Sequence, residues 1–285
     1  MLTLVESLSL AGDRAKQNDD ACGAQGAVAW VIDGATDLHD TPISGYASDA
    51  SWLACNLNRY LYDEFWIGDL QGCNEDELRR YFRNASDRVK SDWEFEEPSA
   101  PERWMLPTAS LLAVSDVDGA LLKGLHLGDC RCFVLDAAGR GCTLGGRDSD
   151  EEARAAADAL KRSSGSAPLR NQRTLLLLRQ KRAAHNTDGG YWVFGLQPEC
   201  ADHARAWTLA PARPAHVLLC TDGFSALVDR YRAYDAASLV RAALEKGLHE
   251  LGRELRAIEE EDAGGAKHPR FKPSDDATAL LLRLT

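Results

Sequence analysis

The sequence predicts an α/β fold in which sheets and helices form separate layers of one domain. Three observations support this prediction. Short apolar runs with strand character occur near both ends and in the middle of the chain. Two amphipathic helices separate the early runs from the middle ones, and a long amphipathic segment precedes the last run. Strand runs broken by helix pairs, without an internal repeat or a low-complexity linker, favour a single layered domain over residues 1–285.

The first third of the chain contains two predicted strands followed by two predicted helices. Thr3–Leu10 alternates in polarity, and Ala27–Ile32 is an uninterrupted apolar run of the kind found in buried strands. Apolar residues at helical spacing predict a helix over Ser48–Phe65. A second helix is expected from Asn74 to about Trp93, because Asn74 is a favourable N-cap and three carboxylates follow it in the first turn.

Strand signals dominate the middle of the chain. Apolar runs begin at Thr108 and continue beyond Asp118-Gly119, a dipeptide typical of a hairpin turn. Ser149–Arg162 is rich in Ala, Glu and Arg and is expected to be helical. Ser163–Pro168 should break this helix, and Leu175–Asn186 should continue as another one.

The last third of the chain alternates again between strand and helix signals. Tyr191–Phe194 and His216–Cys220 are apolar and are predicted as strands. Asp235–Glu260 keeps one apolar face and is predicted as one long helix. Glu261–Ser274 reads as a polar loop, and Thr278–Leu284 is predicted as the closing strand.

Composition excludes several classes of partner. The chain of 285 residues has a formal net charge of −11, which disfavours binding to nucleic acid or to an anionic membrane surface. No run approaches the ~18 apolar residues of a membrane span, and Met1–Leu10 lacks the basic cluster of a secretory signal. A cytoplasmic location is therefore expected. The eight cysteines form no CxxC pair and are interpreted as small buried hydrophobic residues.

Aspartates recur where the predicted strands begin or end. An isolated buried carboxylate costs several kcal/mol, so such residues usually meet a cation, a helix cap or water. A single Asp-Gly is most often a turn. The ordered set, in contrast, indicates a cluster of hard oxygen ligands suited to Mg²⁺ or Mn²⁺. Its members are Asn18-Asp19-Asp20, Asp33-Gly34, Gly128-Asp129, Asp222-Gly223 and Asp275-Asp276.

These elements resemble, in order and across nearly the whole chain, the motifs of the PP2C (PPM) family of metal-dependent protein serine/threonine phosphatases. Each motif is weak alone, and six in order before matching strands make a specific set. The matching segments are Asn18-Asp19-Asp20, VIDGATD (Val31–Asp37), Pro107–Ser110, Gly128–Arg131, Thr221–Gly223 and Asp275–Thr278.

The resemblance implies both a fold and a function. The fold would be a four-layer α-β-β-α sandwich of two antiparallel sheets flanked by helix pairs, with a flap-like insertion around 145–198. The function would be hydrolysis of phosphoserine and phosphothreonine in proteins, by direct attack of a water that bridges two divalent metal ions. A phosphorylated protein would be the substrate, and a serine/threonine kinase or its targets would be partners.

The resemblance also assigns catalytic carboxylates and metal ligands for two Mn²⁺ or Mg²⁺ ions. Asp33 and Asp222 would bridge or bind the two ions, and the carbonyl of Gly34 would bind one of them. Asp275 would complete the coordination of the second ion. Asp20 would hold metal-bound waters.

Three positions depart from the family pattern, and one of them is Ala35, where the family often has a histidine. The family's phosphate-binding arginine falls at Ala15 here, so the neighbouring Arg14 and Lys16 are the candidates for phosphate binding. Asp129 would help to bind a weaker third ion. A further aspartate that often contributes to that third site is Ala226 in this chain.

Two other functions stay open at this point. The same centre would suit a phosphatase of a small phosphorylated metabolite, and the departures would suit a catalytically weak PP2C-like binding or regulatory module. The predicted flap also carries a basic stretch, which would either receive a phosphopeptide or form a solvated helix face. Its residues are Arg170, Arg173, Arg179, Lys181 and Arg182.

Overall fold

The protein was analysed as a computed structural model, which describes residues 1–285 apart from 68–72, 97–100, 147–148 and 163–170. The described strands form two antiparallel five-stranded sheets. The first sheet has the order β1 (Leu2–Leu10), β10 (Ala277–Leu284), β9 (Ala215–Cys220), β6 (Arg131–Leu135) and β7 (Gly141–Gly145). The second has the order β2 (Asp20–Gln25), β3 (Val28–Gly34), β4 (Ala109–Val117), β5 (Leu121–Leu127) and β8 (Arg205–Leu209).

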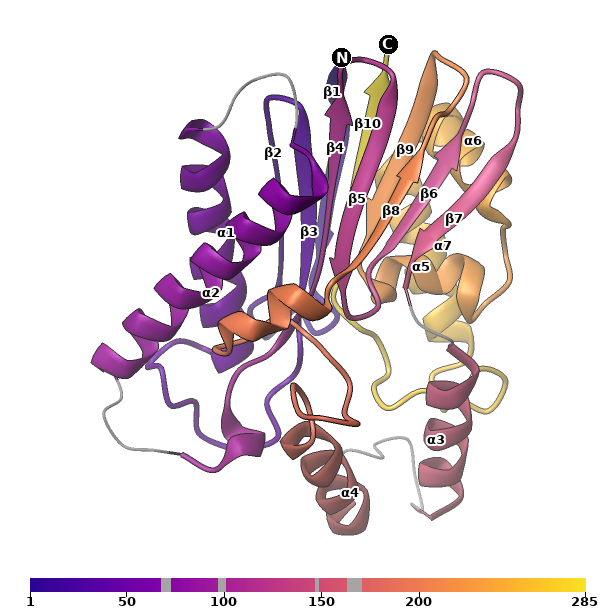
Figure 1. The fold of residues 1–285 in the computed structure, drawn as a ribbon. Helices are drawn as coiled ribbons and strands as arrows, with labels where there is room; N and C mark the ends of the chain where they lie inside the picture. Colours follow the sequence, from indigo (N-terminus) through magenta and orange to yellow (C-terminus); the bar gives the residue numbers. More distant parts are fainter. Residues whose placement is uncertain (68–72, 97–100, 147–148, 163–170) are drawn as a thin grey trace.

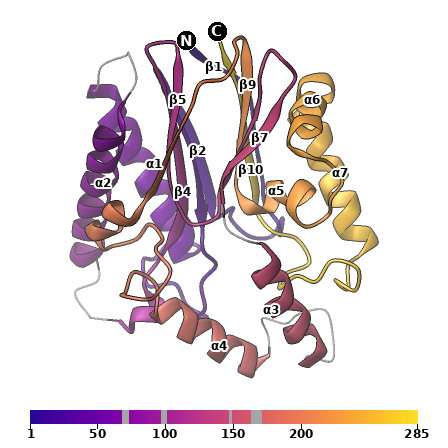
Figure 2. The same cartoon turned by 45° about the vertical axis from the view of Figure 1, so that its right-hand side comes forward.

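The two sheets pack face to face, and helices cover their outer faces (Figures 1 and 2). α1 (Asp49–Ile67) and α2 (Glu75–Glu96) cover the second sheet. α5 (Asp222–Asp229), α6 (Ala236–Lys246) and α7 (Leu248–Glu261) cover the first. The predicted four-layer α-β-β-α sandwich is therefore confirmed.

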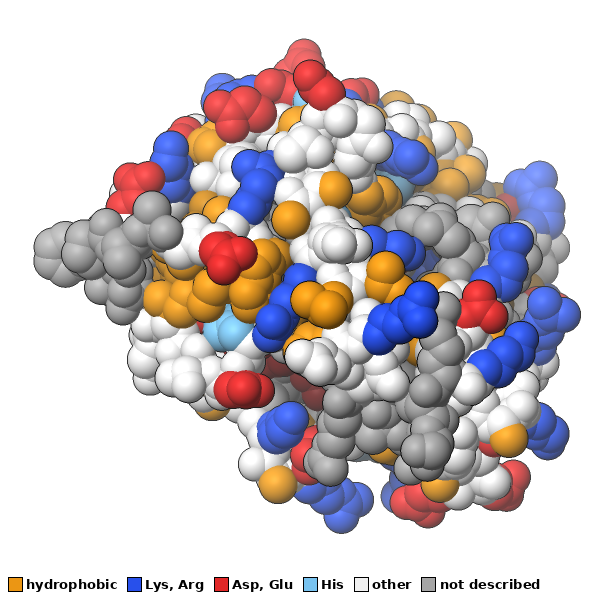
Figure 3. Space-filling view, turned by 90° about the horizontal axis from the view of Figure 1, so that it is seen from below, with side chains coloured by type: hydrophobic (Ala, Val, Ile, Leu, Met, Phe, Trp, Pro, Cys, Tyr) orange, Lys and Arg blue, Asp and Glu red, His pale blue; other side chains and the backbone are white. Residues whose placement is uncertain are grey.

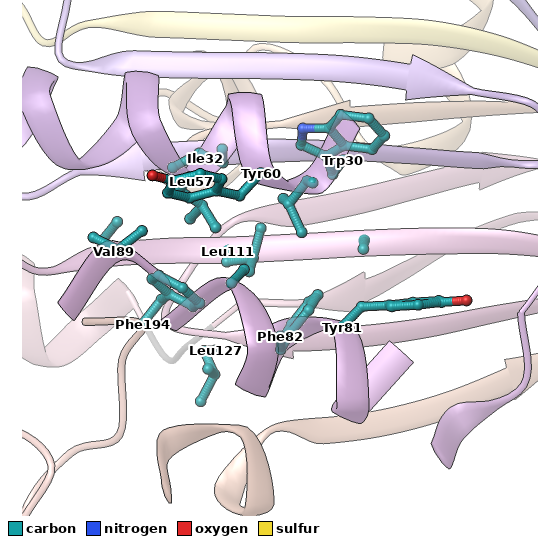
Figure 4. Close-up of a cluster of buried hydrophobic side chains, with 14 of the residues drawn as sticks. Trp30, Ile32, Leu57, Tyr60, Tyr81, Phe82, Val89, Leu111, Leu127 and Phe194 are labelled. Carbon is teal, nitrogen blue, oxygen red and sulfur yellow. The ribbon is translucent and has the colours of Figure 1, made fainter. Parts of the chain in front are cut away.

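Strand β3 shows why the central strands read as continuous apolar runs. Trp30 and Ile32 point into the layer shared with α1 and α2 (Figure 4). The alternate residues Ala29 and Val31 point into the layer between the sheets. A strand that is buried on both faces has no polar side to alternate with, and each of these four side chains is fully buried.

The two long helices on the second sheet begin at side-chain caps. The carboxylate of Asp37 accepts a hydrogen bond of 2.8 Å from the backbone N–H of Asp49 at the start of α1. Asn74 and Glu77 form a reciprocal capping box at α2, with hydrogen bonds of 3.0 and 2.8 Å. The predicted N-cap role of Asn74 is thus confirmed.

Two predictions of secondary structure are wrong. The segment Asp235–Glu260 is not one helix, because Gly247 has φ of 83° and ends α6 while starting α7. Tyr191–Phe194 is not a strand, because it forms a single bridge between Phe194 and Ala109. In this segment the ring of Trp192 stacks on His203 at 3.4 Å, so side-chain packing replaces a ladder of backbone hydrogen bonds.

Two helices, α3 (Ser149–Arg162) and α4 (Gln172–Ala183), lie beyond one end of the sheets (Figures 1 and 2). Two short 3₁₀ helices, η1 (Arg103–Met105) and η3 (Pro198–His203), complete the described elements. The expected break at Ser163–Pro168 lies outside the described residues. Within the described part of the chain, none of the helices combines the length and the apolar character that crossing a membrane requires.

Candidate metal centre

The centre is built around the paired ends of β2 and β3. Asp20, the first residue of β2, lies directly opposite Asp33, near the end of β3. The next residue, Gly34, donates its N–H to the carbonyl of Asp19 at 3.2 Å. A Cβ atom at Gly34 would lie 2.3 Å from that same carbonyl oxygen, so only glycine fits there.

A second pair of strands brings Thr221 and Asp222 to the same place. Asp222 begins α5 directly after β9, and its backbone N–H lies 3.4 Å from Oδ2 of Asp33. The Thr221 hydroxyl donates to Oδ2 of Asp20 at 2.8 Å and accepts from the N–H of Thr278 at 3.0 Å. Thr221 therefore connects the first sheet to the carboxylates of the second.

The two aspartates before β10 have different surroundings. Asp276 accepts hydrogen bonds of 2.7 Å from the N–H groups of both Gly12 and Asp19, which ties the N-terminal loop to β10. Asp275 faces Lys272 instead, with 2.7 Å between Oδ1 and Nζ. Asp276 thus has a structural role, since it connects the N-terminal loop to β10, whereas the Asp275 carboxylate belongs to the cluster.

The fifth aspartate, Asp129, follows β5 and is held by Ser110. The Ser110 hydroxyl donates to Oδ1 of Asp129 at 2.5 Å and lies 3.2 Å from its backbone N–H. Gly128 permits this turn with φ of 84°, and a Cβ there would lie 2.2 Å from the same hydroxyl oxygen. The motif arginine, Arg131, is turned away toward Asp229, with which it pairs at 3.0 Å.

The carboxylates repel one another strongly. Burial raises the pKa of Asp33 well above its usual value, and the charges of Asp222, Asp20, Asp129 and Asp275 raise it further. Burial and the neighbouring carboxylates also raise the pKa of Asp20, despite the Thr221 hydrogen bond. No ion pair to Asp20 or Asp33 occurs within the described ranges. Such a group of like charges needs a bound cation to remain ionised at neutral pH.

Asp275 titrates in the opposite direction. Burial alone would raise the pKa of Asp275, but the charge and hydrogen bond of Lys272, helped by the charge of Arg230, lower it below the usual value. Lys272 therefore acts as an internal counter-ion at one edge of the cluster. Lys272 was not predicted as a site residue, because its only signal in the sequence was a lysine three positions before an aspartate.

A cavity of about 680 Å³ opens from the carboxylates toward α3 and α4. Asp129, Asp222 and Asp275 line it together with residues of α4. Seen from the end where α3 and α4 lie, the surface carries many Lys and Arg side chains (Figure 3). The predicted phosphate-binding residues Arg14 and Lys16 are exposed on the loop before β2, and neither contributes to the cavity wall.

The donor set suits hard divalent cations. The clustered aspartates offer carboxylate oxygens, the ligands that Mg²⁺ and Mn²⁺ prefer. Cys130 directly follows Asp129 in the chain. Burial raises the pKa of its thiol well above the usual value, and repulsion from Asp33 and Asp129 raises it further. A thiol kept protonated in this way is neither a soft metal ligand nor a nucleophile.

A second group of ligand-type side chains lies beside the loop after β3. Oxygens of Asp37 and Asp49 and a ring nitrogen of His39 lie within 4.8 Å of one another. Asp49 already accepts hydrogen bonds from the N–H groups of Ile43 and Ser44 and contacts Nε2 of His39 at 2.8 Å. Asp37 caps α1, so this group holds the loop and the helix in place.

Comparison with protein families assigns the chain. The family model for protein phosphatase 2C matches residues 13–256. The chain belongs to the protein phosphatase 2C family. The predicted family resemblance is thereby confirmed, and comparison with curated protein sequences gives no significant match.

Several solved structures share this fold. The serine/threonine phosphatase PstP/Ppp of Mycobacterium tuberculosis is 18% identical, with a TM-score of 0.58 over 99% of this chain and 98% of the other. PppA of Pseudomonas aeruginosa is 16% identical, with a TM-score of 0.55 over 100% and 98%. A PstP catalytic domain in complex with two manganese ions is 19% identical, with a TM-score of 0.52 over 99% of both chains.

Proposed function

We propose that this PP2C protein is a metal-dependent phosphatase that hydrolyses phosphoserine and phosphothreonine in proteins. The observation that carries the proposal is the meeting of Asp20, Asp33 and Asp222 at the paired strand ends, beside a cavity lined by Asp129, Asp222 and Asp275. Their arrangement is costly for the protein alone and favourable once cations bind. Family membership supports the choice of phosphoester hydrolysis as the reaction.

The aspartates and one backbone carbonyl would hold two Mn²⁺ or Mg²⁺ ions, as the PstP domain holds two manganese ions. Two such ions supply water activation and neutralisation of the phosphoryl charge. Asp129, held by Ser110, is the residue available to a weaker third ion. The proposed ligands are Asp20, Asp33, the Gly34 carbonyl, Asp129, Asp222 and Asp275.

Several residues of the chain would keep these ligands in position. Thr221 orients Asp20, and the hydrogen bond from the N–H of Asp19 to Asp276 holds the loop that carries Asp19. Glycine at 34 and 223 allows backbone groups to approach closely, because a Cβ at Gly223 would lie 1.9 Å from the carbonyl oxygen of Asp276. These constraints would preorganise the centre before substrate arrives.

Lys272 would bind the phosphoryl group of the substrate. Its ammonium lies at the cavity wall beside Asp275. The position of the family's phosphate-binding arginine is Ala15 in this chain, so another cation would take that role. A lysine here gives a point charge instead of a bidentate grip. With its carboxylate partner bound to a cation, the Lys272 ammonium would be available to a substrate oxygen.

The test is phosphate release from a phosphoserine peptide and from an aryl phosphate at neutral pH, with Mn²⁺, with Mg²⁺ and with chelator. The proposal predicts turnover of both substrates that requires either ion. Turnover of sugar or nucleotide phosphates with far higher kcat/KM than of any phosphopeptide would replace the protein substrate by a small metabolite. Absence of metal-dependent turnover on every substrate would reject the proposal.

A further inference from the structure

The cavity beside the carboxylates is lined by an arginine that the proposed chemistry does not use. Arg182, in the last turn of α4, lines the cavity together with Asp222 and Asp275. Its guanidinium donates one hydrogen bond, 3.2 Å long, from Nη2 to the carbonyl oxygen of Thr36. Within the described residues, this carbonyl is its single hydrogen-bond partner, and no carboxylate forms an ion pair with it.

The remaining donors of Arg182 are therefore available to a ligand in the cavity. Burial lowers the pKa of Arg182 to about 10, so the group stays charged at neutral pH. The carboxylate that acts on it is Asp37, but Asp37 is engaged with the N–H groups of Asp49 and Ala50 at the start of α1. A partly desolvated guanidinium with spare donors is a strong site for a carboxylate or phosphate.

The helix that carries Arg182 is anchored on both sides. Arg179 donates to the carbonyl of Leu38 at 2.9 and 2.6 Å, and its guanidinium lies 4.1 Å from the centre of the Trp104 ring. Arg103 donates to the carbonyls of Ala183 and His185 at 3.0 and 2.8 Å. Arg182 is thus held at a defined place relative to the strand end that bears Asp33.

Arg182 and Lys272 lie on different elements beside the cavity. Lys272 lies before β10 and pairs with Asp275 at 2.7 Å, whereas Arg182 lies on α4 and donates to the carbonyl of Thr36. With Lys272 assigned to the reacting phosphoryl group, Arg182 is left for a second group of the substrate. A substrate that satisfies both must carry a second negative charge.

We infer that Arg182 binds a second anionic group of the substrate, so that this phosphatase prefers phosphoproteins with acidic residues beside the phosphorylated residue. The inference rests on the proposed function, because it places the phosphoryl group at the carboxylate edge. A charge-assisted, partly desolvated contact of this kind should change affinity about tenfold or more. A neutral neighbour would leave the guanidinium without a partner in the cavity.

The test uses two phosphoserine peptides that differ only in flanking Glu or Gln residues, together with versions bearing a non-hydrolysable phosphonate. Affinity for the phosphonates is measured by fluorescence anisotropy with Mn²⁺, and kcat/KM is measured for the phosphopeptides. The readout is the ratio of Glu to Gln peptide, so that a general loss of activity cancels. The proteins are wild type, Arg182→Gln, Arg182→Lys and the control Arg173→Gln, a change at an exposed residue of α4 outside the cavity wall.

We expect a ratio of about ten or more in wild type and Arg173→Gln, a ratio near one in Arg182→Gln and an intermediate ratio in Arg182→Lys. A wild-type ratio near one, or an unchanged ratio in Arg182→Gln, would overturn the inference. Metal-dependent hydrolysis of an aryl phosphate distinguishes failure of the inference about Arg182 from failure of the proposed function. If it persists while the ratio is near one, only the inference fails. If it is absent, the proposed function fails, and the anisotropy ratio still decides the role of Arg182.

Discussion

Asp20 and Asp33 lie directly opposite each other in the antiparallel pair of β2 and β3. Like charges at directly opposed positions destabilise a sheet. Here they are compensated in part by the Thr221 hydroxyl and by the N–H of Asp222, which point to one carboxylate each. The protein therefore stores electrostatic repulsion at the place where the proposed cations would relieve it.

Replacing Asp20 by asparagine should stabilise the metal-free protein. The substitution removes a carboxyl group that is costly to ionise here and keeps a carbonyl oxygen for the Thr221 hydroxyl. We expect the melting temperature in chelator to rise by about 2–4 °C, corresponding to about 1 kcal/mol. With saturating Mn²⁺ the order should reverse, because wild type gains more binding free energy. Thermal unfolding under both conditions checks this, and a variant that melts lower in chelator would contradict it.

The stability of the metal-free protein should depend on pH through Asp19. Burial raises the pKa of Asp19 to about 6, with repulsion from Asp276 adding to the effect and the Ser48 hydrogen bond opposing it. A raised pKa means that the folded state binds more protons than the unfolded state between about pH 4 and 6. As the pH rises through this range, the free energy of unfolding of wild type should therefore fall relative to that of Asp19→Asn. Above this range the relative value should be constant. Denaturant titrations in chelator at pH 4.5, 5.5 and 7.5 measure both free energies of unfolding. A wild-type value that rises with pH relative to the value of Asp19→Asn would contradict the prediction.

Glycine 223 should tolerate no side chain. A Cβ there would lie 1.9 Å from the carbonyl oxygen of Asp276, a backbone atom that cannot turn away. We expect Gly223→Ala to lower the free energy of unfolding by about 2 kcal/mol or more and to abolish metal-dependent turnover. Gly264→Ala is the matched control, because no atom lies within 4 Å of a Cβ there. Equal stability of the two variants in urea denaturation would refute the packing argument.

Replacing Lys272 by methionine should weaken phosphate binding. The change removes the ammonium and keeps a flexible apolar side chain of similar length. We expect KM for an aryl phosphate and the inhibition constant of inorganic phosphate to rise about tenfold, with Lys272→Arg restoring part of the loss. Lys246→Met is the control, since Lys246 pairs with Glu254 at 2.8 Å between α6 and α7. An unchanged inhibition constant in Lys272→Met would assign the phosphate contact to another residue.

The layered fold and the meeting of the aspartates were predictable because both depend on short-range signals. Strands buried on both faces read as apolar runs, as in β3, and an aspartate at the end of such a run cannot be explained by packing alone. The break at Gly247 was missed because the apolar face continues through it, although the glycine itself was the signal. Strands β2, β7 and β8 are short or partly exposed and give no continuous apolar run.

The basic residues could not be sorted by sequence. Arg179 and Arg182 lie in one charged stretch with Arg173, yet Arg179 anchors α4 to Leu38 while Arg182 lines the cavity. Arg173 stays exposed, and Arg170 lies outside the described residues. Which charges meet a backbone carbonyl, and which meet a cavity, depends on the packing of α4 against a loop more than a hundred residues earlier, so local composition carries no information about it.

Hydrolysis of an aryl phosphate by wild type and Asp222→Asn, each with Mn²⁺ and with chelator at neutral pH, should decide whether the clustered aspartates form a metal-dependent phosphatase centre. Calorimetric titration of Mn²⁺ into both proteins accompanies it. We predict Mn²⁺-dependent turnover in wild type, a loss of about a hundredfold or more in a folded Asp222→Asn protein, and weaker Mn²⁺ binding to the variant. Turnover that survives chelator, or that is equal in the two proteins, would contradict it.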